Sequence, residues 1–156
     1  MPVAAGLPGI HLIMIELARP PHEAVPSRAS FGEAGLSEET ARTVLVVEDE
    51  PLVRELIVAE FEDAGYQVRE AEDGREAMSA LDELADIHLL FTDIRLPGDM
   101  DGWRIAQEAR RRRPNLAVIY ATGYSVDAPR LVPGGCLLTK PYRPAAIIET
   151  ARAMGV

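Results

Sequence analysis

Two apolar runs that each end in carboxylates constrain the fold of this chain more than any other feature. Residues 43–47 lead directly into Glu48 and Asp49, and residues 87–92 lead into Asp93. Neither run alternates strictly between apolar and polar residues, and such runs are typical of strands buried on both faces inside a parallel sheet. We therefore expect both strands to deliver acids to the same edge of one sheet.

From Thr43 onward, strand patterns alternate with helix patterns. The apolar runs predict five strands, at residues 43–47, 66–71, 87–93, 116–121 and 136–139. Helices are predicted to begin at Pro51, Asp73, Asp101 and Pro144. Prolines interrupt residues 124–135, where we expect only a short or distorted fourth helix. This alternation predicts an α/β fold, a flavodoxin-like doubly wound five-stranded parallel sheet with strand order 2-1-3-4-5.

The carboxyl ends of these strands collect residues suited to phosphoryl transfer. Glu48 and Asp49 follow the first strand, Asp93 ends the third, Thr122 follows the fourth and Lys140 follows the fifth. Crowded carboxylates repel one another, and they persist where a hard cation such as Mg²⁺ neutralises them. In this interpretation Asp93 is the acceptor, Thr122 donates a hydrogen bond and Lys140 neutralises charge. Taken alone, Asp93 has an equally good explanation as the residue that opens a turn.

The composition excludes several other classes of protein. The chain has 156 residues, of which 47% are hydrophobic and 26% charged, as expected for one soluble globular domain. A net charge of −9 argues against direct DNA binding, and no apolar run reaches the roughly 20 residues of a membrane span. The single cysteine, Cys136, cannot form an intramolecular disulfide, and we expect it to pack in the core of a cytoplasmic protein.

Residues 1–42 differ from the rest, because five prolines are scattered there among Gly, Ser, Ala and Glu. We expect residues 1–42 to be a disordered N-terminal extension and assign the folded domain to residues 43–156. A start codon placed upstream of the true domain would give the same composition, and both explanations stay open.

Five short motifs carry a resemblance to a known family. They are Val-Glu-Asp-Glu-Pro at 47–51, Thr-Asp-Ile-Arg-Leu-Pro-Gly at 92–98, Met-Asp-Gly at 100–102, Ala-Thr-Gly at 121–123 and Lys-Pro at 140–141. In this order they make residues 43–154 similar to the receiver domain of bacterial two-component response regulators. The stretches 120–124 and 140–142 resemble a subgroup of receivers that often occur as single domains.

The resemblance implies a role for each residue of the cluster. Asp93 would be phosphorylated by a histidine kinase or a phosphotransfer protein, and Thr122 and Lys140 would hold the phosphoryl oxygens. The ligands of Mg²⁺ would be the side chains of Asp49 and Asp93, the backbone carbonyl of Arg95 and, through water, Glu48. The domain would then be a signalling phosphoacceptor rather than an enzyme, with only self-catalysed transfer and slow autodephosphorylation.

The sequence departs from the family pattern in three respects, of which the short fourth helix is one. Asp99 is an extra residue in its loop, and we expect it to alter the loop without removing a ligand. Leu137 stands where many receivers carry an aromatic switch residue. Because the chain ends soon after the last predicted helix, we expect the signal to leave through a downstream protein partner that binds residues 124–135, the fifth strand and the last helix. A homodimer stays open as a further assembly.

Two other functions fit part of the pattern. A metal-dependent phosphohydrolase could use the same carboxylates, but Arg95 stands where a second acid would protonate a leaving group. A receiver-like module that binds a partner without phosphorylation is disfavoured because Asp93, Thr122 and Lys140 are all present. The remaining polar residues are interpreted as structural. We expect Arg110 to Arg113 to end a helix and His88 to be a hydrogen-bonded core histidine.

Overall fold

The structure, a computed structural model of the chain, describes residues 41–123 and 128–156. Within these residues five strands and four helices follow one another as β1 (Thr43–Val47), α1 (Pro51–Asp63), β2 (Gln67–Ala71), α2 (Gly74–Glu83), β3 (Ile87–Asp93), α3 (Gly102–Arg112), β4 (Ala117–Thr122), β5 (Cys136–Thr139) and α4 (Pro144–Ala153). The strands that we predicted agree with these bounds to within one residue. The expected disordered extension lies outside the described residues, apart from its last two.

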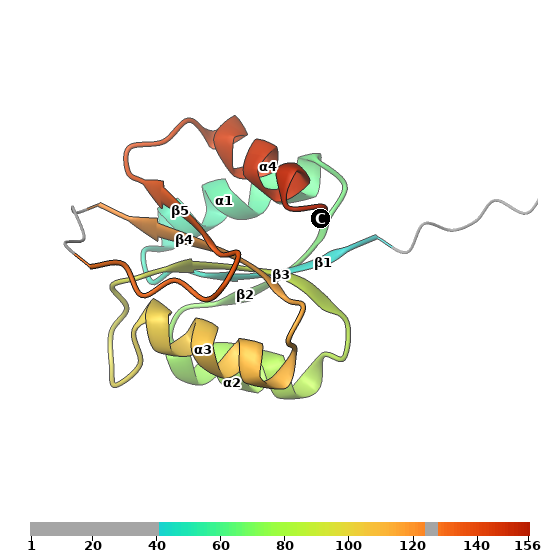
Figure 1. Cartoon of the computed structure of the whole chain (residues 1–156). Helices are drawn as coiled ribbons and strands as arrows, with labels where there is room; N and C mark the ends of the chain where they lie inside the picture. The colour runs from blue at the N-terminus through green and yellow to red at the C-terminus, as the bar shows by residue number, and fades with distance from the viewer. Residues whose placement is uncertain (1–40, 124–127) are drawn as a thin grey trace, which may run out of the picture. The chain divides into compact units, whose positions relative to one another are not determined.

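The strands form one parallel sheet in the order β2-β1-β3-β4-β5, which confirms the predicted topology. Helices α1 and α4 cover one face of this sheet, and α2 and α3 cover the other (Figure 1). The central strands β1, β3 and β4 are therefore buried on both faces, which explains why their sequences lack polar alternation. The alternating strand β2 lies at an edge, as its sequence predicts.

Local sequence fixes where the helices begin. Asp73 accepts a hydrogen bond from Glu76 N at 2.8 Å, and Asp101 accepts one from Arg104 N at 2.8 Å. These are N-caps, in which a side-chain oxygen satisfies an amide that has no partner inside the helix. Gly65 follows α1 with a φ of 91°, a conformation that favours glycine. The capping residues therefore set the ends of the helices that flank the sheet.

Each face of the sheet has its own hydrophobic core. Alternate residues of β1 enter opposite cores: Leu45 packs with α2 and α3, whereas Val46 packs with α1 and α4. The two cores bury Trp103 and Phe61, one in each. Strands that are covered on both sides hold their backbone in place, so the residues at their carboxyl ends start from fixed positions.

The segment between β4 and β5 differs from the prediction. Residues 128–135 contain no helix, and residues 124–127 lie outside the described part of the chain. Tyr120 lies in β4, and its hydroxyl accepts a hydrogen bond from Val132 N at 3.1 Å. The Arg110 guanidinium donates to the carbonyl of Pro133 at 2.8 Å. These contacts, with the hydrogen bond from Gly135 N to the carbonyl of Val132 at 2.9 Å, hold residues 132–135 in a turn. Pro129 and Pro133 lack the amide N–H that a helix would use, so residues 128–135 form no helix.

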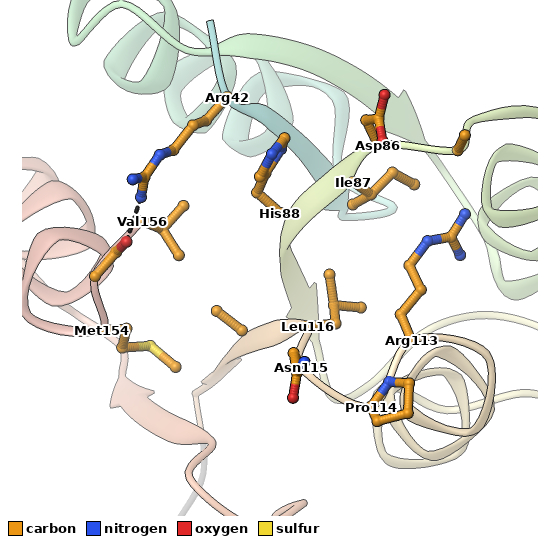
Figure 2. A pocket seen from close by; sticks show the side chains of 13 residues that line it. Arg42, Asp86, Ile87, His88, Arg113, Pro114, Asn115, Leu116, Met154 and Val156 are labelled. Carbon is orange, nitrogen blue, oxygen red and sulfur yellow. Dashed lines mark hydrogen bonds between the residues drawn. The ribbon is translucent and has the colours of Figure 1, made fainter. Parts of the chain in front are cut away.

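The amino ends of the strands border an open groove (Figure 2). His88 lines this groove and is exposed, so the expectation of a core histidine is wrong, although its Nδ1 does accept a hydrogen bond from Thr43 N at 3.1 Å. Thr43 pairs with Ile87 and Val44 pairs with Leu89, so His88 is an extra residue in a bulge. The bulge turns its side chain away from the core.

Residues at both ends of the domain complete the amino edge. Arg42 belongs to the folded domain, since its carbonyl accepts from Gln67 N at 3.0 Å and its guanidinium donates to the carbonyl of Gly155. Figure 2 shows this second contact across the groove.

None of the helices in the described ranges has the length and apolarity needed to cross a lipid bilayer.

Candidate functional site

The candidate site lies at the carboxyl edge of the sheet, where the predicted residues meet. Asp93 is the last residue of β3, and Glu48 and Asp49 directly follow β1, its neighbour in the sheet. One ligand oxygen from each of these three carboxylates lies within 4.8 Å of the others. The prediction that two separate strands bring their acids together is therefore confirmed in the structure.

Lys140 completes the cluster from the far end of the sheet. Its ammonium Nζ lies 3.0 Å from Glu48 Oε2 and 3.0 Å from Asp93 Oδ2. The backbone N–H of Lys140 donates to the carbonyl of Thr122 at 2.7 Å, which fixes the chain just beyond β5. The peptide bond between Lys140 and Pro141 is cis. One cation thus joins two acids that are 92 and 47 residues away from it in the sequence.

Burial controls the protonation of this cluster. Glu48 is only 2% exposed, and burial raises the pKa of its carboxyl above the ordinary value, with the Asp93 charge adding to the rise and Lys140 opposing it. Burial by itself lowers the pKa of Lys140. Hydrogen bonds and charge from Glu48 and Asp93 outweigh this effect, so that the pKa of Lys140 lies above its ordinary range. The lysine therefore stays charged at physiological pH.

The remaining predicted residues lie on neighbouring backbone. Thr122 ends β4 and is buried, one residue beyond Ala121, which pairs with Asp93. Arg95 follows Asp93 by two residues, and its backbone N–H donates to Asp93 Oδ1 at 3.2 Å. The structure thus brings Glu48, Asp49, Asp93 and Lys140 into one cluster and sets Thr122 and Arg95 beside it.

A close backbone approach fixes the acceptor loop. A Cβ atom at Gly102 would lie 2.1 Å from the carbonyl oxygen of Asp93, so only glycine fits there. Gly102 N donates to the carbonyl of Ile94 at 2.9 Å. The first turn of α3 therefore packs directly on the backbone that carries Asp93. The extra residue Asp99 lies elsewhere in this loop and leaves the carboxylate cluster intact, as expected.

The charges of the cluster suit a divalent cation. Three carboxylates and one ammonium, Glu48, Asp49, Asp93 and Lys140, carry a formal charge of 3 × (−1) + 1 = −2. Carboxylate oxygens are the ligands that Mg²⁺ prefers, and Asp49 is exposed enough to leave space for water ligands. The residues present therefore fit a Mg²⁺ ion in both charge and chemistry.

Two residues beside the cluster were missed by the sequence analysis. The Arg54 guanidinium donates to the carbonyl of Glu48 at 2.7 Å, yet in the sequence it is only one polar residue of an amphipathic helix. Tyr142 follows the cis bond and packs its ring edge-on against Phe91, and burial raises the pKa of its hydroxyl to about 12. Arg54 gave no local signal, because its partner is a main-chain atom. The sequence did contain a hint of Tyr142, in the Lys-Pro-Tyr stretch.

Comparison with known proteins decides the family. The sequence model of the response regulator receiver domain matches residues 44–152, which is more than half of the chain. This chain belongs to the receiver domain family. Receiver domains are signalling domains of two-component systems, so the resemblance read from the five motifs is confirmed. The strand order of this receiver is the predicted one, with helices on both faces of the sheet.

Individual relatives match this receiver over the same region. It is 31% identical over 120 residues to the response regulator receiver protein CpdR of Brucella abortus, covering 72% of this chain and 96% of CpdR. It is 34% identical over 117 residues to the sensor kinase CckA of the same organism, covering 72% of this chain but only 12% of CckA. The crystal structure of a receiver protein from Sinorhizobium medicae superimposes with a TM-score of 0.70 at 31% identity, covering 74% of this chain and 94% of that one.

Proposed function

We propose that this receiver accepts a phosphoryl group on Asp93 from a histidine kinase or a phosphotransfer protein and signals through a protein partner. The observation that carries the proposal is the contact of the Lys140 ammonium with both Glu48 and Asp93, at 3.0 Å each. A fixed ammonium beside the acceptor carboxylate can also stabilise the negative oxygens of an incoming phosphoryl group. The proposal implies a cytoplasmic location, which stays a prediction.

Asp93 is suited to be the nucleophile. Its side chain is 13% exposed, enough for a donor to reach one oxygen while Lys140 and the Arg95 amide hold the group in place. A carboxylate oxygen of Asp93 forms a bond to phosphorus as the bond from phosphorus to the imidazole nitrogen of the donor breaks. The imidazole keeps the electron pair and takes up a proton, and the product is an acyl phosphate. Lys140 and Thr122 then contact the new phosphoryl oxygens.

The carboxylates would hold the cofactor. Glu48, Asp49 and Asp93, with the backbone carbonyl of Arg95, are the groups that would bind Mg²⁺. When bound, the ion neutralises charge on the transferred oxygens. Buried Glu48 keeps its hydrogen bonds to Lys140 and to the Glu50 amide, so it would act through an intervening water while exposed Asp49 offers the direct contact.

A substitution at Asp93 tests the acceptor. Asp93→Asn keeps the size of the side chain but removes the nucleophilic charge, so incubation with acetyl phosphate and Mg²⁺ should add no phosphoryl group. Intact-mass spectrometry measures the incorporation. Asp86→Asn is the matched control, since Asp86 is an exposed aspartate before the amino end of β3, and it should be phosphorylated like the wild type. Wild-type incorporation in Asp93→Asn would show that Asp93 is not the acceptor.

The stoichiometry separates the alternatives. One phosphoryl group per chain that is stable in acid and released by hydroxylamine supports an acyl phosphate. Steady turnover of a phosphoester would support a phosphohydrolase instead, and no incorporation under any condition would support a binding module that works without phosphorylation. Only the first outcome agrees with the proposal.

The output would leave near the β4–β5 connection. Residues 128–135 are tied to β4 through the Tyr120 hydroxyl, and β4 ends in Thr122. Leu137 packs beside the same core cluster in place of an aromatic switch residue. We propose that phosphorylation changes protein binding at residues 128–135, β5 and α4. Hydrogen exchange with beryllofluoride, which stands in for the phosphoryl group, should show changed protection there. Changes confined to the Asp49 and Asp93 loops would contradict this output route.

A further inference from the structure

No residue in the described ranges holds the side chain of Asp49. It is exposed, and within the described ranges it takes part in no hydrogen bond or ion pair. Asp93, in contrast, is held by Lys140 and by the Arg95 amide. Because no described side chain forms a hydrogen bond with Asp49, the direction of its carboxylate depends on the backbone on either side. The contacts of that backbone therefore decide whether Asp49 lies near the other acids.

The backbone before Asp49 is held by two contacts from other elements. Glu48 N donates to the carbonyl of Ala71, the last residue of β2, at 3.2 Å. The carbonyl of Glu48, which belongs to the peptide unit shared with Asp49, accepts from Arg54 Nη1 at 2.7 Å. The first contact continues the sheet, whereas the second comes from a side chain one turn into α1. Arg54 thus holds the peptide plane from which Asp49 projects.

Arg54 is itself held in place. Its Nε donates to Glu70 Oε2 at 3.1 Å, and its side chain is only 16% exposed. A guanidinium is planar and rigid, so fixing one nitrogen on Glu70 also fixes the direction of another toward Glu48. Arg54 of α1 therefore links Glu70 of β2 to Glu48, which follows β1. The three elements β1, β2 and α1 meet at the site.

We infer that Arg54 is a positioning residue that orients the Glu48–Asp49 peptide and so prepares Asp49 to bind a divalent cation. This inference rests on the metal site of the proposed function. Groups that orient a ligand typically change metal affinity by tenfold or more when they are removed. The sign of the effect is diagnostic, since removing a positive charge near a cation site would by itself strengthen binding. Positioning predicts weaker binding.

The test is a Mg²⁺ titration of the full chain, followed by the NMR shifts of the Asp49 and Glu50 amides. Arg54→Met keeps the length of the side chain and removes both contacts, so the Kd for Mg²⁺ should rise about tenfold. Arg54→Lys retains the charge but lacks the rigid pair of nitrogens that joins Glu48 to Glu70, so its Kd should lie between those of the wild type and Arg54→Met. Equal or tighter binding by Arg54→Met would overturn the inference.

A matched control separates positioning from loss of an ion pair. Arg69 in β2 pairs with Glu83 at 3.3 Å, on α2 rather than on the loop that carries Glu48 and Asp49. Arg69→Met should therefore leave the Kd unchanged. Glu70→Gln leaves the Arg54 contact with Glu48 but weakens its support, and roughly a twofold rise is expected. If Arg54→Met does not fold, Arg54→Lys and Glu70→Gln decide, because unchanged binding in both would overturn the inference. Absence of Mg²⁺ binding in the wild type would instead count against the proposed metal site.

Discussion

Lys140 at the carboxyl edge of the sheet and Arg113 at the amino edge are held in opposite ways. At the carboxyl edge, Lys140 contacts other side chains, those of Glu48 and Asp93. At the amino edge, arginines contact the main chain. Arg113 donates to the carbonyls of Leu81, at 2.8 Å, and Leu84. Arg42 does the same for Gly155, as Figure 2 shows.

The direction of the helices explains this difference. Helices of a parallel α/β fold end at the amino edge, where the last carbonyls have no partner inside the helix and attract cations. Arg113 meets this need at the end of α2. Helices begin at the carboxyl edge, where anions are favoured instead. Lys140 can exchange its side-chain partners when a new anion binds, so the carboxyl edge is suited to signalling. The main-chain carbonyls that Arg113 binds are fixed, so that contact at the amino edge is suited to stability.

The largest expected effect comes from removing the cation of the carboxyl edge. Lys140→Met should slow phosphorylation by acetyl phosphate about 100-fold, which corresponds to about 2.7 kcal/mol of barrier, because a fixed positive charge beside the transferred oxygens is lost. The effect is measured by intact-mass spectrometry as the rate at which the phosphorylated protein forms. A rate within threefold of the wild type would mean that Lys140 serves only to hold Glu48 and Asp93 together.

The opposite result is expected at the amino edge. Arg113→Met removes the charged donor of two carbonyls, and the free energy of unfolding should fall by about 2 kcal/mol. Urea denaturation measures it. The rate of phosphorylation should stay within twofold of the wild type, and a large loss of rate in a folded variant would break the distinction between the two edges.

A smaller effect is expected where β4 meets the β4–β5 connection. Tyr120→Phe removes the acceptor of the Val132 N–H but keeps the buried ring, so the free energy of unfolding should fall by about 1 kcal/mol. Exchange of the Val132 amide with solvent should become faster. Unchanged exchange would show that the turn at residues 132–135 is held by Arg110 and local packing alone.

The smallest effect on the free energy of unfolding should come from replacing the buried Glu48 by a neutral residue in metal-free buffer. The raised pKa of Glu48 means that its contribution to stability is present below pH 4.5 and lost as the pH rises through its pKa in the folded state. Glu48→Gln should therefore match the wild type near pH 4 and exceed its free energy of unfolding at pH 8. We expect the two free energies of unfolding to differ by less than about 1 kcal/mol at pH 8, because the substitution also weakens the contact with Lys140. A variant less stable than the wild type at pH 8 would contradict this sign.

Much of the fold and the site could be predicted from local patterns. The unbroken apolar runs of β1 and β3, the caps Asp73 and Asp101 and the position of Asp93 at a strand end each depend on neighbours in the sequence. The hydrophobic effect and capping act over a few residues, so they leave a readable pattern. The strand order followed from the alternation of strands with helices.

Long-range contacts were decided only by the tertiary structure. The sequence placed Lys140 at the edge with the acids, but not its contacts with Glu48 and Asp93 together. It gave no sign that Arg54 reaches a carbonyl, since main-chain acceptors look alike in every sequence. His88 was predicted to be buried, and a bulge exposes it. Tyr120 and Arg110 bind the backbone of Val132 and Pro133, and no local pattern predicted these contacts. Local periodicity records which face of an element is apolar, whereas such contacts depend on how separate elements meet in space.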